Sequence, residues 1–219
     1  MIRAVFFDLD GTLFDRASAR RRYGLNLVHR RPEAFPSGRD VVDLLDMAGR
    51  EADPGEDRRA FGRRIAVRFP GLGMTGAEVA NDLGGRIAGF VRPDPRIARL
   101  LADLSRRHRL AIVSNGSGRV QRAKLARLGL GDATPRAFIS GEVGVAKPEP
   151  ALFESALAWA DSMASEALFV GDDPVRDIAG ASAIGMATCW ISGGRPYPAG
   201  LPRPDRMIVQ VHELGEVVT

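Results

Sequence analysis

Two aspartates follow an apolar run close to the N-terminus. The run AVFF at residues 4–7 leads into DLDGTL, which places Asp8 and Asp10 on either side of a leucine and before Gly11. Side chains two residues apart lie on the same side of a strand, so the two carboxylates converge where the strand gives way to a turn. Two unit charges about 4 Å apart repel by roughly 4 kcal/mol at an effective dielectric constant near 20. The pair therefore predicts a cation beside it, although either aspartate taken alone is explained as a turn residue or a helix cap.

More polar residues follow later apolar runs. Ser114 ends the run LAIVS and Asn115 follows it, whereas Asp172 and Asp173 follow ALFVG and Asp177 comes one helical turn later. Ligands of doubly wound sheets bind outside the carboxyl ends of the strands. We therefore expect these side chains at the same mouth as the first two aspartates.

A lysine supplies a candidate counter-charge. Lys147 lies in the loop sequence GVAKPEP, in a chain that has 29 arginines and only two lysines. Arginine serves in this chain wherever a general cation is sufficient. A lysine in a loop of glycine and proline therefore suggests that a compact ammonium group is needed there.

Apolar runs alternate with helical patterns along most of the chain. The runs cover residues 4–8, 110–114, 137–140, 167–171, 187–191 and 207–211. Near-continuous apolar strands that alternate with helices are typical of a parallel sheet covered on both faces, so the predicted fold is α/β with a doubly wound, Rossmann-like sheet. Helix signals fit the gaps: Pro150 and the pair Asp173 and Pro174 mark helix starts, and Gly129 and Gly185 mark helix ends.

The segment 15–92 interrupts this alternation. Its apolar residues have helical spacing, as in the group around Ile65 and Val67, and it shows no convincing strand pattern. It also carries 15 arginines against 11 acidic residues, and thus the whole net charge of +4. We predict a helical cap domain at 15–92, inserted into a Rossmann-like catalytic core formed by 1–14 and 93–219.

The composition limits the cellular setting and the partners. At 219 residues and 45% hydrophobic content, the chain can bury a sizeable core in one large or two unequal domains. It has no signal-peptide pattern and no apolar window of the roughly 18 residues that a membrane span needs, so we expect a cytoplasmic protein without membrane contact. The single cysteine, Cys189, lies in an apolar run and is interpreted as a core residue. Arg20, Arg21 and Arg22 form a basic run, which we interpret as a solvated helix face rather than a nucleic-acid site.

Four sequence stretches together resemble a known family. They are FFDLDGTLFD, IVSNGS, GVAKPEP and VGDDPVRDIAGA, in this order along the chain. The set is similar to the four motifs of the haloacid dehalogenase-like hydrolase superfamily, and the helical insert lies where that superfamily's first type of cap domain belongs. The resemblance implies phosphoryl transfer through an aspartyl-phosphate, with Asp8 as the nucleophile. It also implies Asp8, Asp10 and Asp172 as ligands of Mg²⁺, with Asp10 contributing its backbone carbonyl, and this ion would be the cation that the first two aspartates require.

The same resemblance assigns roles to the other candidates. Asp10 would protonate the leaving alkoxide and later take a proton from the attacking water. Ser114, with the backbone N–H groups of Asn115 and Gly116, would bind the phosphoryl oxygens. Lys147 would offset the charge that the nucleophile shares with the phosphoryl group.

Two acidic residues have less specific assignments. Asp173 is explained as a helix cap. Asp177 would either orient water at the ion or pair with Lys147. Both would then assist the metal site indirectly, with Asp177 the stronger candidate.

The predicted activity is Mg²⁺-dependent hydrolysis of a small phosphorylated metabolite. Dehalogenases of the superfamily lack an acid two residues after the nucleophile, so Asp10 favours phosphoryl transfer; phosphonate hydrolases need a lysine from the cap, and 15–92 contains none. A phosphosugar mutase shares all four motifs and is the alternative, and a non-catalytic phospho-receiver module is a further one that the large insert disfavours. Arg16, Arg20 and Tyr23 are candidate contacts for the leaving group, although a helical arginine is more often solvated. The substrate and the oligomeric state stay open.

Overall fold

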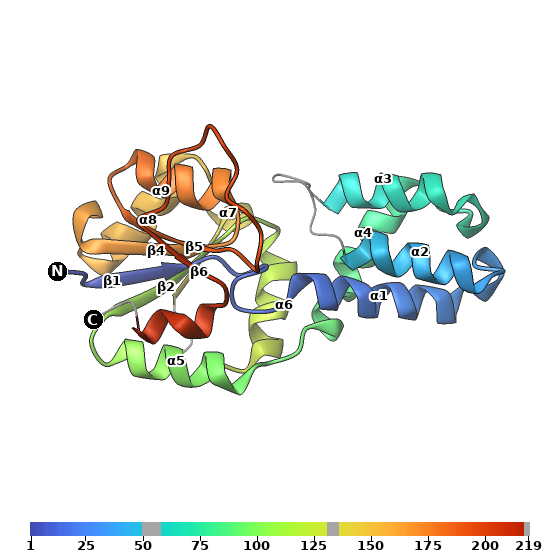
Figure 1. The fold of residues 1–219 in the computed structure, drawn as a ribbon, viewed down its shortest axis with the longest axis horizontal. Helices are drawn as coiled ribbons and strands as arrows, with labels where there is room; N and C mark the ends of the chain where they lie inside the picture. Colours follow the sequence, from blue (N-terminus) through green and yellow to red (C-terminus); the bar gives the residue numbers. More distant parts are fainter. Residues whose placement is uncertain (50–57, 131–135, 217–219) are drawn as a thin grey trace. The chain divides into compact units, whose positions relative to one another are not determined.

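The chain folds into two compact units. The computed structural model describes residues 1–49, 58–130 and 136–216. One unit comprises Met1–Phe14 and Pro93–Thr219, and the other comprises Asp15–Arg92 (Figure 1). Among the described helices, none combines the length and the apolar character that crossing a membrane requires.

The first unit contains a parallel sheet. Its six strands are β1 (Ala4–Phe7), β2 (Arg109–Ser114), β3 (Arg136–Ile139), β4 (Ala167–Gly171), β5 (Ala187–Ile191) and β6 (Arg206–Ile208), in the spatial order β3-β2-β1-β4-β5-β6. Phe7 at the end of β1 is in register with Ile112 of β2 and Val170 of β4, and all the pairs are parallel. The strand order reverses between β1 and β4, which is where doubly wound sheets bind ligands. The predicted α/β fold class is confirmed, and each predicted strand position is a strand.

The last strand is shorter than predicted. The run 207–211 pairs with β5 only as far as Ile208, and the segment η7 (Val211–Glu216) follows as a 3-10 helix. β6 lies at the edge of the sheet with Met207 57% exposed, whereas β1 and β4 are buried throughout. An edge strand lacks a second neighbour that would hold the remainder of the run in the sheet.

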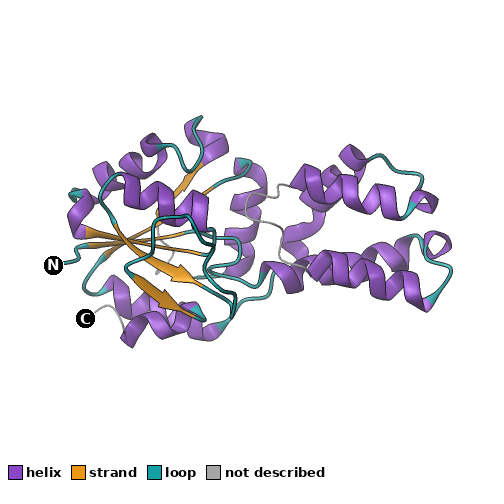
Figure 2. Ribbon diagram, turned by 45° about the horizontal axis from the view of Figure 1, so that its top comes forward, coloured by secondary structure: helices purple, strands orange, loops and turns teal. Residues whose placement is uncertain are grey.

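Helices lie on both faces of this sheet (Figure 2). They are α5 (Pro95–Ser105), α6 (Gly118–Leu128), α7 (Ser140–Val143), α8 (Pro150–Ala160) and α9 (Gly180–Ala183), with the 3-10 segment η5 (Ala164–Glu166) before β4 and the π-helical segment η6 (Pro174–Ala179) before α9. On one face, Phe6 of β1, Phe169 of β4 and Phe153 of α8 belong to one hydrophobic core. This core fixes the strand ends from which the site is built.

The predicted helix boundaries in this unit are confirmed. Pro150 is the first residue of α8. The Asp173 carboxylate accepts hydrogen bonds from the two N–H groups that follow Pro174. Gly129 and Gly185, after α6 and α9, take φ values of 58° and 84°, a region that favours glycine.

The second unit is helical, and the described residues 15–49 and 58–92 contain no strand. Its elements are α1 (Arg16–Arg30), η1 (Pro32–Ala34), α2 (Gly38–Gly49), α3 (Arg58–Arg68), η2 (Pro70–Leu72), α4 (Gly76–Arg86) and η3 (Ile87–Phe90), with α1 packed against α2 and α3 packed against α4. Ile65 of α3 is fully buried, but Val67 is 83% exposed, which corrects the apolar group predicted there. Residues two apart on a helix point about 200° apart, so the side chains of Ile65 and Val67 cannot lie on the same face.

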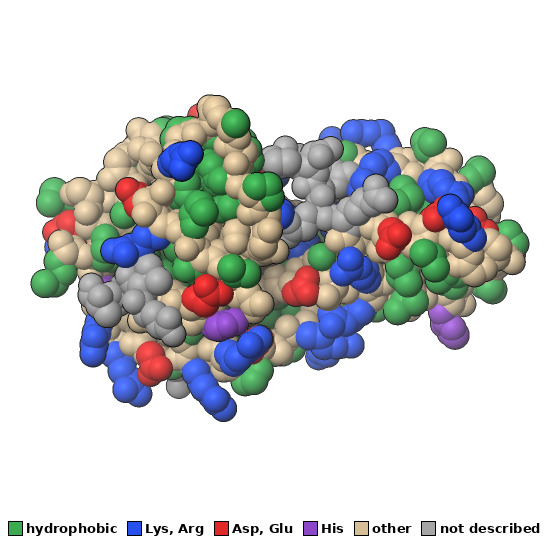
Figure 3. Space-filling model, viewed as in Figure 1, with side chains coloured by type: hydrophobic (Ala, Val, Ile, Leu, Met, Phe, Trp, Pro, Cys, Tyr) green, Lys and Arg blue, Asp and Glu red, His purple; other side chains and the backbone are tan. Residues whose placement is uncertain are grey.

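The basic run in α1 is also corrected. Arg20 is buried, and its guanidinium lies 5.0 Å from the centroid of the Phe61 ring. Arg21 is exposed, and the half-buried Arg22 donates a hydrogen bond to the carbonyl of Phe90. Consecutive helix residues point about 100° apart, so three arginines in a row cannot form one solvated face. On the face of the molecule drawn in Figure 3, basic side chains are interspersed with acidic and hydrophobic ones.

Candidate active site

Three buried carboxylates meet at the ends of the two central strands. Asp8 directly follows β1, Asp172 directly follows β4, and Asp177 lies in η6. One carboxylate oxygen from each of the three lies within 4.8 Å of the others. The exposed fractions are 7% for Asp8, 3% for Asp172 and 1% for Asp177. The structure therefore brings together two residues predicted as metal ligands, and it adds Asp177 to them.

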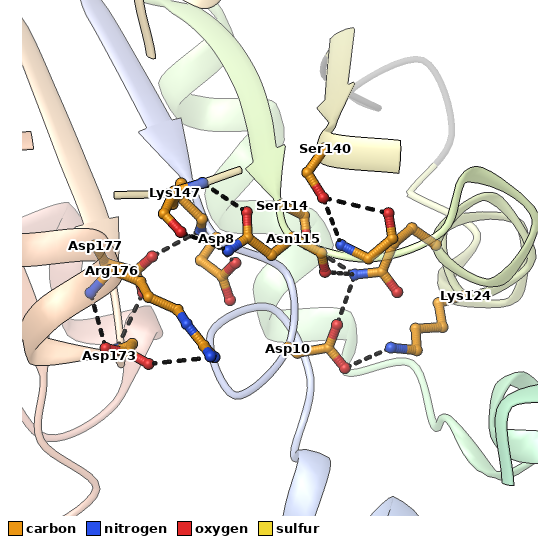
Figure 4. A network of polar contacts seen from close by, with 12 residues as sticks. Asp8, Asp10, Ser114, Asn115, Lys124, Ser140, Lys147, Asp173, Arg176 and Asp177 are labelled. Carbon is orange, nitrogen blue, oxygen red and sulfur yellow. Dashed lines mark hydrogen bonds and ion pairs between the residues drawn. The ribbon is translucent and has the colours of Figure 1, made fainter. Parts of the chain in front are cut away.

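Lys147 is the cation within this group. Its Nζ donates to Asp8 Oδ1 at 2.7 Å and to Asp177 Oδ1 at 2.6 Å, and the residue is only 4% exposed (Figure 4). Asn115 holds the loop in place, because its Nδ2 donates to the Lys147 carbonyl at 2.9 Å and its Oδ1 accepts the Lys147 N–H at 2.8 Å. Two carboxylates thus share one ammonium group, and the third, that of Asp172, lies beside them.

The titration of this group follows from burial and from the neighbouring charges. Burial raises the pKa of Asp177 to about 7; the positive charge of Lys147 opposes this effect, and the negative charge of Asp8 adds to it. Burial alone would lower the pKa of Lys147, but the carboxylates of Asp177 and Asp8 raise it above its usual value. Lys147 therefore stays charged, and the acids compete for its charge.

Two glycines make room for the carboxylates. Gly11, in the turn after β1, has φ of +90°, and a methyl group on it would overlap the Asp172 carboxylate. Gly171, at the end of β4, would likewise overlap the Asp177 carboxylate if it carried a side chain. Only glycine allows the backbone to pass this close to two acidic side chains.

Asp172 is held by one residue of β5 and one that follows it, neither of which the sequence motifs included. Trp190 Nε1 donates to the Asp172 carbonyl at 3.0 Å. Arg195 Nη2 donates to the same carbonyl at 3.2 Å and lies 3.9 Å from the Asp172 carboxylate. Arg195 is one of 29 arginines and carries no distinguishing signal, whereas Trp190 is one of only two tryptophans.

The Asp10 carboxylate lies outside the group of three and has other partners. Its Oδ2 accepts from Gln121 Nε2 at 2.7 Å, and its Oδ1 accepts from Lys124 Nζ at 2.5 Å (Figure 4). Gln121 Nε2 also donates to Ser114 Oγ at 2.7 Å. Any contact of Asp10 with a metal is thus left to its backbone carbonyl. Neither partner was predicted from the sequence, although Lys124 is one of the only two lysines in the chain.

Three further expectations can be compared with the structure. The Gly116 N–H, expected to bind phosphate, donates instead to Ser140 Oγ at 2.9 Å. Asp173 caps η6 as predicted, and its own N–H donates to Asp177 Oδ2 at 3.0 Å. Asp173 therefore acts on the carboxylate group through its backbone rather than through its side chain. Arg20 and Tyr23, considered as leaving-group contacts, are buried within the helical unit.

Known proteins resemble this chain in sequence and in fold. A family model described as haloacid dehalogenase-like hydrolase matches residues 2–185. The pyrimidine 5'-nucleotidase YjjG of Escherichia coli is 35% identical over 134 residues, which cover 60% of this chain and 59% of that protein, less than two thirds of its length. The glyceraldehyde 3-phosphate phosphatase of Pyrococcus abyssi is 31% identical over 202 residues, which cover 89% of this chain and 83% of that protein. The solved structure of the HAD-hydrolase YfnB of Bacillus subtilis bound to magnesium matches 100% of this chain and 99% of its own, with a TM-score of 0.76 at 20% identity, and shows the same fold.

Proposed function

Because this chain belongs to the haloacid dehalogenase-like hydrolases, we propose that it is a Mg²⁺-dependent phosphatase of a small phosphorylated metabolite that reacts through an aspartyl-phosphate. The observation that carries the proposal is the buried group of Asp8, Asp172 and Asp177 around Lys147. The two relatives named above are a nucleotidase and a sugar-phosphate phosphatase, and they support hydrolysis of a phosphoric monoester as the reaction.

The carboxylate group fits a hard divalent cation. Its donors are oxygens, they are buried, and they carry more negative charge than Lys147 offsets, which suits a Mg²⁺ ion that takes few protein ligands. Asp8, Asp172 and the backbone carbonyl of Asp10 would hold the ion, and Asp177 would support them. Bound there, Mg²⁺ would neutralise charge between the nucleophile and the phosphoryl oxygens.

Asp8 is the proposed nucleophile and Asp10 the proposed acid and base. An Asp8 oxygen attacks phosphorus in line; the new O–P bond forms as the bond to the leaving oxygen breaks, and Asp10 gives its proton to that oxygen. Asp10 then takes a proton from water while the water oxygen attacks the phosphorus of the aspartyl-phosphate. Inorganic phosphate leaves and the Asp8 carboxylate is restored. The Lys147 ammonium, bound to Asp8, offsets the charge that Asp8 shares with the phosphoryl group.

Ser114 and Asn115 are proposed to bind the phosphoryl oxygens. Gln121 donates to Ser114 Oγ, so the hydroxyl hydrogen of Ser114 can point to an anion. The Asn115 side chain holds Lys147, so Asn115 would contribute its backbone N–H. These donors lie where β2 ends and precede the N-terminus of α6, a position that favours negative charge.

The presence of an acid beside the nucleophile favours phosphoryl transfer over dehalogenation. An alkoxide is a strong base and needs a proton as it leaves, whereas a halide is a weak base and needs none. Asp10 follows Asp8 by two residues and could supply that proton. A reaction with halide as the leaving group would give this residue no task.

The proposal is tested by phosphate release from a panel of sugar phosphates, nucleoside monophosphates and phosphorylated amino acids. We expect turnover with Mg²⁺, loss of turnover in EDTA, and loss of turnover in Asp8→Asn but not in Asp103→Asn, which changes an exposed aspartate of α5. Full activity in EDTA or in Asp8→Asn would contradict the mechanism. A product that keeps its phosphate on another carbon would identify the mutase instead.

A further inference from the structure

Two side chains of α6 bind both oxygens of the Asp10 carboxylate. Gln121 donates to Oδ2 and Lys124 to Oδ1, at 2.7 and 2.5 Å. The two residues are three apart on α6 and therefore lie on the same side of the helix. Gln121 and Lys124 are 1% and 7% exposed, so they form a buried polar face of α6 that contacts the Asp10 carboxylate.

The same face of α6 also contacts the turn that follows Asp10 and the end of β2. Lys124 Nζ lies 5.7 Å from the centroid of the Phe14 ring, and the Phe14 carbonyl accepts the Gly11 N–H that closes the turn after Asp10. On the other side, Gln121 Nε2 donates to Ser114 Oγ at 2.7 Å. Gln121 thus links the Asp10 carboxylate directly to the hydroxyl group at the end of β2.

We propose that Gln121 and Lys124 are positioning residues, which fix the Asp10 carboxylate relative to Ser114 so that proton transfer occurs at the oxygen leaving a bound phosphoryl group. The inference rests on the proposed function, because it assumes that Asp10 is the acid and base. With both oxygens held, the Asp10 side chain loses its freedom to rotate away. A positioned acid contributes about 10²- to 10⁴-fold to a rate, and a displacement of about 1 Å can remove about 100-fold.

The choice of lysine supports a positional role. This chain uses arginine for 29 of its 31 basic residues, and its two lysines are Lys147, which binds Asp8, and Lys124, which binds Asp10. The compact ammonium group can be buried against one carboxylate oxygen, whereas the wider guanidinium fork binds both. Using lysine leaves the second oxygen of Asp10 for Gln121, and hence for the link to Ser114.

The first test compares leaving groups that differ in their need for a proton. Para-nitrophenyl phosphate releases a weakly basic phenolate, whereas phenyl phosphate has nearly the same shape and releases a stronger base. In Lys124→Met and Gln121→Met we expect kcat on phenyl phosphate to fall by about 100-fold, kcat on para-nitrophenyl phosphate to fall by less than about 10-fold, and KM to change little. Arg127→Met, which removes an exposed cation from the same helix, should match the wild type on both. Equal losses on the two substrates would indicate general damage and would overturn the proposal.

The second test uses Asp10 itself and whichever panel substrate the wild type hydrolyses fastest. If Gln121 and Lys124 act through Asp10, Lys124→Met should lower kcat further by less than about two-fold in an Asp10→Asn background, because coupled residues are not additive. If Lys124→Met lowered kcat in the Asp10→Asn background by as large a factor as in the wild type, the proposal would be overturned. If the wild type releases phosphate from no substrate, the proposed function itself fails, and that outcome differs from both results above.

Discussion

In the helical unit one carboxylate is surrounded by donors, whereas in the α/β unit two carboxylates of a group of three share one donor. Asp82 accepts hydrogen bonds from Tyr23 Oη at 3.0 Å, Arg30 Nη2 at 2.5 Å and Arg86 Nε at 2.8 Å. Lys147 instead donates to both Asp8 and Asp177, and an Asp172 oxygen lies within 4.8 Å of theirs. The first arrangement places one carboxylate among several donors, and the second gathers three carboxylates beside one ammonium group, with the Arg195 guanidinium 3.9 Å from Asp172.

The pKa values of Asp82 and Asp177 are shifted in opposite directions. Burial alone would raise the pKa of Asp82, but hydrogen bonds from Arg86, Arg30 and Tyr23 lower it below its usual value. At Asp177 burial prevails, and the pKa rises to about 7. An acid with a lowered pKa stabilises the fold, whereas a buried acid with a raised pKa beside other charged groups is typical of a functional site.

Lys147→Met is expected to have the largest effect on this contrast. The substitution removes the ammonium group that the buried carboxylates share, and breaking such a buried pair costs about 3–5 kcal/mol. We expect a loss of that size in the free energy of unfolding by urea, measured in EDTA at neutral pH, together with loss of phosphate release. Arg127→Met should stay within about 0.5 kcal/mol of the wild type because its side chain is exposed. If both variants were equally stable, the acids at the strand ends would not depend on Lys147.

Mg²⁺ should stabilise the protein through the α/β site. A ligand at about 100 times its Kd stabilises the folded state by about 2.7 kcal/mol. We expect the thermal unfolding midpoint to rise with Mg²⁺ relative to EDTA in the wild type and in Asp82→Asn, and to rise much less in Asp172→Asn. A similar rise in Asp172→Asn would show that the ion binds elsewhere, and the contrast between the two sites would be lost.

Asp82→Asn is expected to destabilise the helical unit by about 1–3 kcal/mol, because the buried Tyr23 hydroxyl and the half-buried Arg30 guanidinium lose a charged acceptor. The folded-state pKa of Asp82 is lower than its unfolded value of 3.8. The contribution of the Asp82 carboxylate to stability is therefore fully present above pH 3.8, and it is lost as the pH falls through the lower, folded-state pKa. Urea unfolding of wild type and variant should differ at neutral pH and converge in strong acid. A difference that grows toward acid pH would contradict this account.

The carboxylates at the strand ends could be predicted from the sequence because parallel strands place their carboxyl ends at one edge. Asp8 and Asp172 each directly follow an apolar run, and the runs became neighbouring strands. Asp177 was placed between two roles, and its contacts show that it pairs with Lys147 and also lies beside the other acids. These contacts depend on topology, and topology follows from the alternation of apolar runs.

Contacts that depend on the rotation of a helix could not be predicted in the same way. Gln121 and Lys124 reach Asp10 because α6 turns one polar face toward the strand ends, and apolar spacing does not show where a buried polar face points. Arg20 was misjudged for the related reason that a run of charges was assigned to one face. The rarity of lysine could have marked Lys124 as a candidate partner of a carboxylate, as it marked Lys147.

An exposed ion pair should have the smallest effect, even though it lies in the α/β unit. Arg122 donates to Glu142 from Nε at 3.0 Å and from Nη2 at 2.7 Å, but the two side chains are 52% and 37% exposed. Water already solvates both charges, so Glu142→Gln should cost less than about 1 kcal/mol. The cost should shrink further when the ionic strength is raised to about 1 M, where the screening length is about 3 Å. Urea unfolding at low and high salt measures both effects, and a loss as large as that of Asp82→Asn would mean that the number of hydrogen bonds, rather than burial, decides what a charged pair contributes.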